Sequence, residues 1–301
     1  MTERLNLRQL DYFIAAAETG TMTAAAERLH ISQSAISAGL AGLERQLGVQ
    51  LLLRTKAKGL TLTYAGQRLL PAAHALLARA DELRLGMADV GTQPAGELRV
   101  GCFTTIAPFL LPGLMESFTK VFPQVVVHFL EGSLKELQEY LLQGRCELAL
   151  LYDTDIQPGV AYDLLHEAQP HVLLPADDRL AGQDVVRPAD LAGRDMVMLD
   201  VPPSQHYFRG ILAELGVAPI IRHSSMNFEM VRCLVARGVG YSLLVQRPVT
   251  DLSYEGLPLV IRSLDRRVRP VRVVLAHAEG ALLTRRASVF AEFCRDRWRT
   301  D

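Results

Sequence analysis

Cysteine is scarce in this sequence of 301 residues, and the few cysteines never cluster. The four stand at positions 102, 146, 233 and 294, with no C-x-x-C pair and no group of histidines beside them. A zinc site needs several thiolate or imidazole ligands close together, so this spacing predicts that no metal is bound. The spacing instead favours buried free thiols in a reducing compartment.

Long apolar runs are also missing. No stretch of about 18 or more apolar residues occurs, so no membrane-spanning helix is expected. The first residues, "MTERLNLRQLDYF", lack the basic segment followed by an apolar core that marks a secretory signal. We therefore expect a soluble, cytoplasmic protein that makes no contact with a membrane.

Neither sign of charge is in large excess. The formal net charge is -1 at pH 7, so the overall charge does not indicate a nucleic-acid partner. Residues 1–66 contain seven Lys or Arg and five Asp or Glu, a net of +2, which leaves -3 for the remainder. Because 49% of the residues are apolar, the chain is expected to fold, and its length allows two or three domains.

Signature motifs of common enzymes are absent as well. The chain has no G-x-S-x-G, no Walker loop, no H-E-x-x-H and no G-x-G-x-x-G after an expected strand. Its eight histidines are scattered, which favours surface or core positions over catalytic ones. We predict that the protein is not an enzyme and has no cofactor. An enzyme with an unfamiliar cleft is the alternative.

Three short helices are expected in the N-terminal part, and only a few residues separate the last two. Ile31 and Ile36 flank the start of the third helix and can pack as a hydrophobic staple. The expected helices run from residue 7 to Gly20, over 24–29 with Thr23 as N-cap, and over 33–47 with Ser32 as N-cap and Gly48 at the end. The buried face of the third helix is expected to consist of Ile36, Leu40, Leu43 and Leu47.

This close pair of helices is typical of a DNA-binding helix-turn-helix. Ala25 and Ala26 are small enough to let two helices cross closely, while one face of the third helix stays polar. Glutamine can bridge adenine, serine can bond to base edges or phosphates, and an alanine methyl can contact thymine. An ordinary three-helix bundle with a polar face is the alternative. The candidate DNA-contacting residues here are Thr23, Ser32, Gln33, Ser34, Ser37 and Ala38.

The following stretch, "LLLRTKAKGLTLT", predicts a β-hairpin with a basic tip. Arg54, Lys56 and Lys58 lie at or near this tip, where they can contact phosphates beside a recognition helix. A solvated basic turn without a ligand is the alternative.

The run from "LRQLDYF" through the hairpin to "LTYAGQRLL" resembles the LysR-type transcriptional regulators. The matching features are the helix-turn-helix, the "LE-x-x-LG" continuation and the "LT-x-AG" start of a long helix. Many members carry a basic residue just before the paired alanines and another around the middle of the recognition helix, where this chain has Ala24, Ala38 and Gly39. Gly39 and Gly42 each cost the helix about 1 kcal/mol relative to alanine. We therefore expect few direct base contacts and a larger share of specificity from DNA shape.

A long helix is predicted from Thr63 to about Val90. Its apolar residues alternate at spacings of four and three, which is typical of a coiled-coil seam and therefore predicts a homodimer. A helix that packs on its own domain is the alternative. Pro71 should kink the helix, and "GTQPAG", residues 91–96, is typical of a hinge. The seam residues are Leu69, Ala73, Leu76, Ala80, Leu83, Met87 and Val90.

After residue 96 strand-like and helical stretches alternate, which predicts an α/β fold with mainly parallel sheets. Expected strands are "ELRVGCF", "VVVHFL", "ELALLYD", "HVLLP", "MVMLD", "PIIRHSS", "YSLL" and "VRVVLAH". Expected helices span residues 107–121, 134–143, 204–215 and 227–237.

This region resembles the effector domain of LysR-type regulators, which is similar to periplasmic binding proteins. The resemblance lies in the run from "GELRVGCFTTIAPFLLPG" to "CELALL" and in "VRCLVARGVGYSLL". It implies a winged helix-turn-helix domain (1–62), a dimerisation helix (63–90), a hinge and an effector domain (97–301). The effector domain would comprise subdomain I, residues 97–168 with 268–301, and subdomain II, residues 169–267. The implied partners are a two-fold related double-stranded DNA site, a second subunit, in many members a tetramer, and RNA polymerase.

Hydroxyl and amide side chains stand beside several expected helix starts, where unpaired N–H groups attract anions. They suggest a small organic acid or an amino acid as effector, with a neutral aromatic compound as the alternative. Ordinary N-caps without any ligand would also explain these residues. A solute-binding protein is a second functional class, and a redox switch through Cys102 is a further variant. The candidate effector-binding residues are Thr104, Thr105, Ser133, Ser204, Ser224, Ser225 and Asn227.

Overall fold

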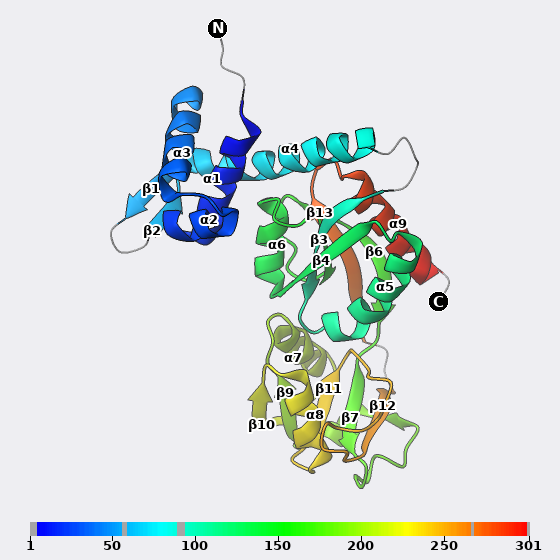
Figure 1. The fold of residues 1–301 in the computed structure, drawn as a ribbon. Coiled ribbons are helices and arrows are strands. Elements are labelled where there is room, and N and C mark those ends of the chain that lie inside the picture. Colours follow the sequence, from blue (N-terminus) through cyan, green and yellow to red (C-terminus); the bar gives the residue numbers. More distant parts are fainter. Residues whose placement is uncertain (1–4, 56–58, 89–93, 266–267, 300–301) are drawn as a thin grey trace.

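The computed structural model describes residues 5–55, 59–88, 94–265 and 268–299. A small helical module sits at one end of a long helix, and that helix crosses one side of an α/β unit (Figure 1). A second α/β unit lies on the opposite side of the first, away from the long helix. Within the described segments no helix is both long and apolar enough to cross a membrane.

The N-terminal module forms where capping residues and apolar periodicity predict it. The third helix has the predicted bounds, because the Ser32 hydroxyl accepts from the Ala35 N–H at 3.2 Å and Gly48 ends it in a left-handed conformation. Thr23 is not a cap: the second helix begins earlier, and the extended Thr21 accepts from the Ala24 N–H at 3.1 Å. The module comprises α1 (Leu7–Thr19), α2 (Met22–Leu29), α3 (Gln33–Leu47), β1 (Leu52–Thr55) and β2 (Gly59–Leu62).

Small residues let these helices approach closely. Ala25 is fully buried between helices, and a side chain at Gly39 would collide with the Tyr12 ring of α1. Ile36, Leu40 and Leu43 are buried in the module core as predicted. Leu47 is exposed, so the predicted buried face of α3 ends one turn earlier.

Hydrogen bonds between side chains and backbone N–H groups connect α3, the hairpin and the long helix α4 (Tyr64–Ala88). The Glu44 carboxylate accepts from the N–H groups of Leu51 and Leu52 at 2.7 and 3.2 Å. Thr63 caps α4 by accepting from the Gly66 N–H at 3.0 Å, and Gly66 packs directly on the Leu51 carbonyl. These contacts explain why Glu44 stands in the "LE" motif and why Thr63 and Gly66 stand in the "LT-x-AG" motif.

Helix α4 continues through Pro71 to Ala88. Val90 and residues 91–93 of the predicted hinge lie outside the described residues. Gly96 belongs to a strand and not to the hinge.

The first α/β unit is built on a five-stranded sheet of order β4-β3-β5-β13-β6. Strand β3 is parallel to β4 and β5, whereas β13 is antiparallel to β5 and β6. Its elements are β3 (Gly96–Phe103), α5 (Ala107–Val121), β4 (Val125–Gly132), α6 (Leu134–Leu142), β5 (Leu148–Tyr152), β6 (Val160–Ala168), β13 (Val271–Ala278) and α9 (Arg285–Arg299).

The second unit contains a four-stranded sheet of order β11-β7-β12-β8 and the parallel pair β9–β10. Because β7 pairs antiparallel with β11 and β12, the prediction of mainly parallel sheets is wrong, and both units are mixed. The elements are β7 (His171–Pro175), β8 (Val185–Val186), η1 (Pro188–Leu191), β9 (Asp195–Leu199), α7 (Ser204–Glu214), β10 (Ile220–Ser225), α8 (Phe228–Ala236), β11 (Ser242–Leu244) and β12 (Leu259–Leu264).

Polar contacts fasten the N-terminal module and α4 to the first α/β unit. The Arg79 guanidinium on α4 donates to the carbonyls of Leu282 and Leu283 at 3.0 and 2.9 Å. Glu18 of α1 lies within ion-pair distance of Arg145, which follows α6. The helical module and the α/β unit are therefore linked by charge as well as by the chain.

Candidate nucleic-acid interface and effector cleft

The exposed face of α3 carries most of the predicted DNA-contacting side chains. Gln33, Ser34 and Ala38 are exposed, and Ser32 uses its hydroxyl as the helix cap. Ser37 is half-buried and accepts a hydrogen bond from the Arg54 guanidinium at 3.1 Å. The exposed face of α3 and the first strand of the hairpin thus form one polar surface.

Of the remaining predicted DNA-contacting residues, the structure describes Thr23 and Arg54. Thr23 is exposed within α2, although it is not the cap. Arg54 is exposed on β1, and Lys56 and Lys58 lie outside the described residues.

The seam predicted along α4 is divided between two environments. Ala73 is 1% exposed in the core of the N-terminal module, and Leu69 is half-buried against that core, so neither is available to a partner subunit. Leu76 and Leu83 are 42% and 71% exposed, and Ala80 is half-buried. The side chain of Met87 is outside the described set, as is Val90. The apolar residues left for a partner therefore lie in the second half of α4.

A cleft lies between the two α/β units, and it is nearly closed. Its volume of about 20 Å³ is enough for roughly one water molecule. A hydrogen bond of 3.0 Å from the Gln246 amide to the Tyr152 hydroxyl spans it. The rings of Phe109 and Phe228 meet edge-on, with centroids 5.1 Å apart. The cleft is lined by Thr105, Tyr152, Thr154, Leu199, Pro203, Ser204, Tyr207, Phe208, Phe228, Val245, Gln246 and Val271.

Only two of the seven predicted effector-binding residues line this cleft. Thr105 precedes α5 and Ser204 is the first residue of α7, and both are buried. Thr104 is exposed and donates to the Gly132 carbonyl at 3.2 Å. Ser133 forms a capping box with Glu136, so its hydroxyl is already engaged.

The other three residues also serve the backbone or face solvent. Ser225 accepts from the Asn227 N–H at 3.1 Å, and Asn227 caps α8 by accepting from the Met230 N–H at 2.9 Å. Ser224 is exposed. Thr104, Ser133, Ser225 and Asn227 satisfy local N–H or carbonyl groups and do not line the nearly closed cleft, so their convergence on an effector stays a prediction.

The helices that border the cleft are the ones without side-chain caps. Neither α5 nor α7 has a side-chain hydrogen bond at its N-cap, whereas α6 and α8 are capped by Ser133 and Asn227. The positive ends of α5 and α7 are therefore left for another group near the cleft.

Four polar residues of the cleft lining are missing from the sequence predictions: Tyr152, Thr154, Tyr207 and Gln246. Burial raises the pKa of the Tyr152 phenol, although contacts with Gln246 and Thr105 act in the opposite direction. Tyr152 therefore stays neutral and can donate a hydrogen bond within the cleft. Tyr152 ends β5 and Gln246 follows β11, so neither stands at a helix start and no capping signal marks them.

Two family models match almost the whole chain. Residues 7–67 match the bacterial regulatory helix-turn-helix protein, lysR family, and residues 91–299 match the LysR substrate binding domain. The chain belongs to the LysR family. Its two matched regions coincide with the helical module and with the pair of α/β units.

Full-length relatives agree with this assignment. The chain is similar to the crystal structure of HinK, a LysR family transcriptional regulator from Pseudomonas aeruginosa, with 38% identity, a TM-score of 0.67 and coverage of 98% and 99% of the two chains. It is similar to a full-length OxyR variant from the same organism, with 26% identity, a TM-score of 0.75 and coverage of 97% and 95%. The HTH-type transcriptional regulator YvbU of Bacillus subtilis is 27% identical over 97% of this chain and 98% of its own.

The LysR assignment settles the functional class. These proteins are transcriptional regulators and not enzymes, and this chain is a DNA-binding regulator with a C-terminal effector-binding domain. Across the described residues no group of three or more His, Cys, Asp or Glu is arranged to hold a metal ion.

The cysteines of this LysR-type chain are all free. Burial raises the pKa of the thiols of Cys102, Cys146 and Cys294, which disfavours the reactive thiolate. These environments give no support to a cysteine-based redox switch.

Proposed function

We propose that this LysR-type regulator responds to a small organic acid or amino acid that binds between the two α/β units. The observation that carries the proposal is the meeting of two uncapped helix N-termini, those of α5 and α7, at one cleft. A carboxylate placed there would receive the positive ends of both helices and hydrogen bonds from the hydroxyls of Thr105 and Ser204.

The apolar part of the effector would contact the aromatic wall of the cleft. Tyr207, Phe208 and Phe228 all line it, and Tyr207 is held by a hydrogen bond of 2.7 Å from its hydroxyl to the Arg269 carbonyl. An aromatic or branched apolar group suits such a wall. The same wall would also suit a neutral aromatic compound. Unlike an acid, such a compound has no negative charge to interact with the helix N-termini.

Binding requires the cleft to open, because its present volume admits no more than about one water molecule. Opening would break the Gln246–Tyr152 hydrogen bond and separate Phe109 from Phe228. The first α/β unit is fastened to α4 through Arg79, so a change in the angle between the units would be passed to the helical module.

The DNA-binding state would be a dimer, in which α4 pairs through its second half and two α3 helices read a two-fold related site. Residues 1–62, 63–90 and 97–301 would act as the DNA-binding, dimerisation and effector-binding units. Pairing of the effector units would complete a tetramer, and bound regulator would act on transcription through RNA polymerase.

The test begins with genomic mapping of the sites that the full-length protein binds, since neighbouring genes indicate a metabolite class. The double variant Thr105→Val with Ser204→Ala should then keep DNA affinity and lose the response to the matching acid. Ser133→Ala is the matched control, because its hydroxyl caps α6 outside the cleft. An unchanged response in the double variant would place the effector elsewhere.

A further inference from the structure

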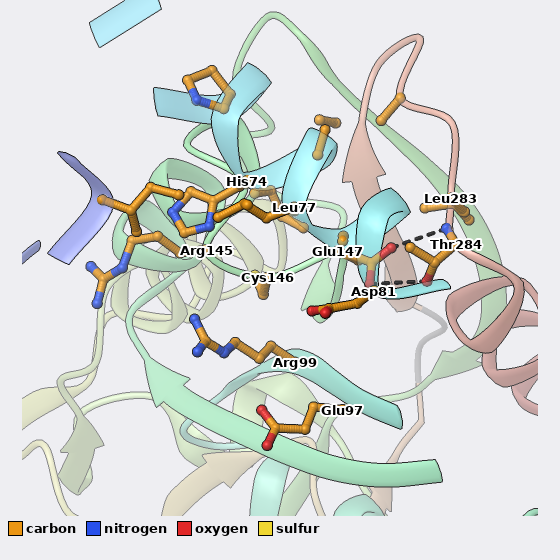
Figure 2. A pocket seen from close by; sticks show the side chains of 18 of the residues that line it. His74, Leu77, Asp81, Glu97, Arg99, Arg145, Cys146, Glu147, Leu283 and Thr284 are labelled. Atoms are coloured by element: carbon orange, nitrogen blue, oxygen red, sulfur yellow. Dashed lines mark hydrogen bonds between the residues drawn. The ribbon is translucent and has the colours of Figure 1, made fainter. Parts of the chain in front are cut away.

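A cavity larger than the cleft between the α/β units lies elsewhere in the molecule. It lies where α4, the N-terminal helices and the first α/β unit meet, and its volume is about 340 Å³ (Figure 2). A volume of this size is in the range of small-molecule sites, whereas the cleft between the units is closed to about 20 Å³. We call this space the junction cavity.

Much of the junction cavity wall is apolar. One side is formed by α4, and the opposite side by the end of α6 and the loop that precedes α9. Figure 2 shows Leu77 of α4 and Leu283 of that loop on the cavity wall. The apolar lining residues are Ile14, Ala15, Leu29, Pro71, Ala75, Leu77, Ala78, Leu141, Leu142, Ala278, Ala281, Leu282 and Leu283.

Several charged side chains on the wall are already paired. Arg28 and Arg145 both contact Glu18, at 2.5 and 3.7 Å, and Arg145 also lies over the Tyr140 ring at 4.0 Å. The Glu97 carboxylate lies 3.9 Å from an imidazole nitrogen of His128 on the neighbouring strand. These groups contribute to the wall without leaving an excess of either charge.

Two other arginines of the wall, Arg286 and Arg99, lack such close ion pairs within the described segments. Arg286 is 6% exposed, and its Nε and Nη1 atoms are buried without a hydrogen-bond partner among the described residues. The nearest acidic atom to Arg286 Nε is Glu147 Oε1, at 4.0 Å. The same Glu147 carboxylate already accepts from the N–H and the hydroxyl of Thr284, at 3.0 and 3.1 Å.

Arg99 is a second cation on the cavity wall. Arg99 lies on β3 and Glu147 lies just before β5. The Arg99 carbonyl accepts from the Glu147 N–H at 3.2 Å, so the two residues are neighbours. The half-buried Arg99 guanidinium has no hydrogen bond or ion pair within the segments that the structure describes. It projects into the open space of the cavity, between Arg145 and Glu97 (Figure 2).

The guanidinium nitrogens of Arg99 and Arg286 that have no partner in the described part of the chain favour an anion at this wall. The Glu147 carboxylate near Arg286 is already shared with Thr284. Unpaired buried guanidinium nitrogens are costly unless they find an acceptor. Asp11 and Asp81 also line the cavity, and burial together with the charge of Asp81 raises the pKa of Asp11. An anionic ligand is therefore expected at the Arg99 and Arg286 side, with its apolar part along α4.

We propose that the junction cavity binds a small carboxylate with an apolar body, as a second ligand site separate from the cleft between the α/β units. The carboxylate bonds to Arg99 and Arg286, and the apolar body packs between Leu77 and Leu283. Because the wall combines α1, α2, α4 and the first α/β unit, an occupied site stabilises this arrangement of the DNA-binding module.

The test uses the full-length protein with phenylacetate and its neutral counterpart phenylacetamide as probes, measured by ligand-observed NMR. Phenylacetate should bind at least about tenfold more tightly than the amide, since one charge-assisted hydrogen bond contributes about that factor. Arg99→Gln should weaken phenylacetate about tenfold, and Arg99→Lys should weaken it less. Leu77→Trp, which fills the cavity without changing charge, should abolish binding.

The variant Thr105→Val with Ser204→Ala separates this site from the effector cleft. It should leave unchanged the phenylacetate binding that Arg99→Gln weakens, whatever happens to the proposed effector response. Circular dichroism melting of each variant shows that the fold is kept. Equal binding of acid and amide, no binding of either probe, or loss of binding in the cleft variant with retention in Arg99→Gln would each overturn the proposal.

Discussion

The Glu18 Oε1 atom lies 3.7 Å from Arg145 Nε, which joins the helix-turn-helix module to the first α/β unit. Glu18 also contacts Arg28 and His74, and its carboxylate is buried among them. Burial alone would raise the pKa of Glu18, but the His74 imidazole and the Arg28 guanidinium outweigh it and lower that pKa to about 2. One carboxylate thus contacts side chains from three parts of the fold.

The first prediction concerns pH. Because the pKa of Glu18 is lower in the folded state than its ordinary value of 4.5, the stability it contributes is present above pH 4.5 and is lost as the pH falls toward 2. The difference between the two pKa values corresponds to about 3 kcal/mol of folding stability, of which about 2 kcal/mol is lost by pH 3. In urea unfolding, the free energy of unfolding of Glu18→Gln should be well below that of the parent protein at pH 6. The two values should be much closer at pH 3. A constant gap between the two proteins would contradict this assignment.

The second prediction concerns DNA. Lys56→Ala should weaken binding to all sequences alike and make the salt dependence shallower by about 0.9, the value of one phosphate contact. Gln33→Ala should instead alter base preference, because Gln33 is exposed on the recognition face. Lys120→Ala is the control, since that lysine pairs with Glu116 on α5. Fluorescence anisotropy against randomised DNA sites measures both effects. An unchanged base preference in Gln33→Ala would show that Gln33 does not contact the major groove.

The third prediction concerns self-association. Replacing Leu76 and Leu83 by Asp places charges on the exposed half of α4, where apolar burial against a partner is expected. Dimer affinity should fall on the order of 100-fold or more, and DNA affinity should fall with it although α3 is untouched. Val249→Asp, at a fully exposed position, is the control. Sedimentation that matches the parent protein would show that α4 does not form the dimer.

The fourth prediction concerns the two glycines of α3. At Gly42 a Cβ would lie 2.7 Å from the end of the flexible Gln9 side chain, which can move, so Gly42→Ala should stabilise by up to about 1 kcal/mol. At Gly39 the Cβ would meet the Tyr12 ring, which is packed against the module core, so Gly39→Ala should destabilise. Thermal melting of the two variants should therefore give shifts of opposite sign. Shifts of the same sign would show that Tyr12 yields as readily as Gln9.

Local patterns predict much of this fold because their physical causes act within a few residues. The Ser32 cap, the end at Gly48 and the apolar spacing between them predict α3 with its observed bounds. Helix α5 likewise begins and ends where the pattern predicts, and each of the eight expected strands is present. Caps and periodicity involve neighbours along the chain, so no knowledge of distant segments is needed.

Tertiary structure alone decides the sheet directions and the sites. Strand β6 is not predicted, and it pairs antiparallel with β13, which is more than a hundred residues away. Gln246 and Tyr152 meet across the cleft although 94 residues separate them. Ser133 and Asn227 carry the same local signal as residues of a ligand site, yet they cap their own helices. A cap and a ligand contact use the same donors and acceptors, so only the packing of distant segments determines which helix N-termini remain open to a ligand.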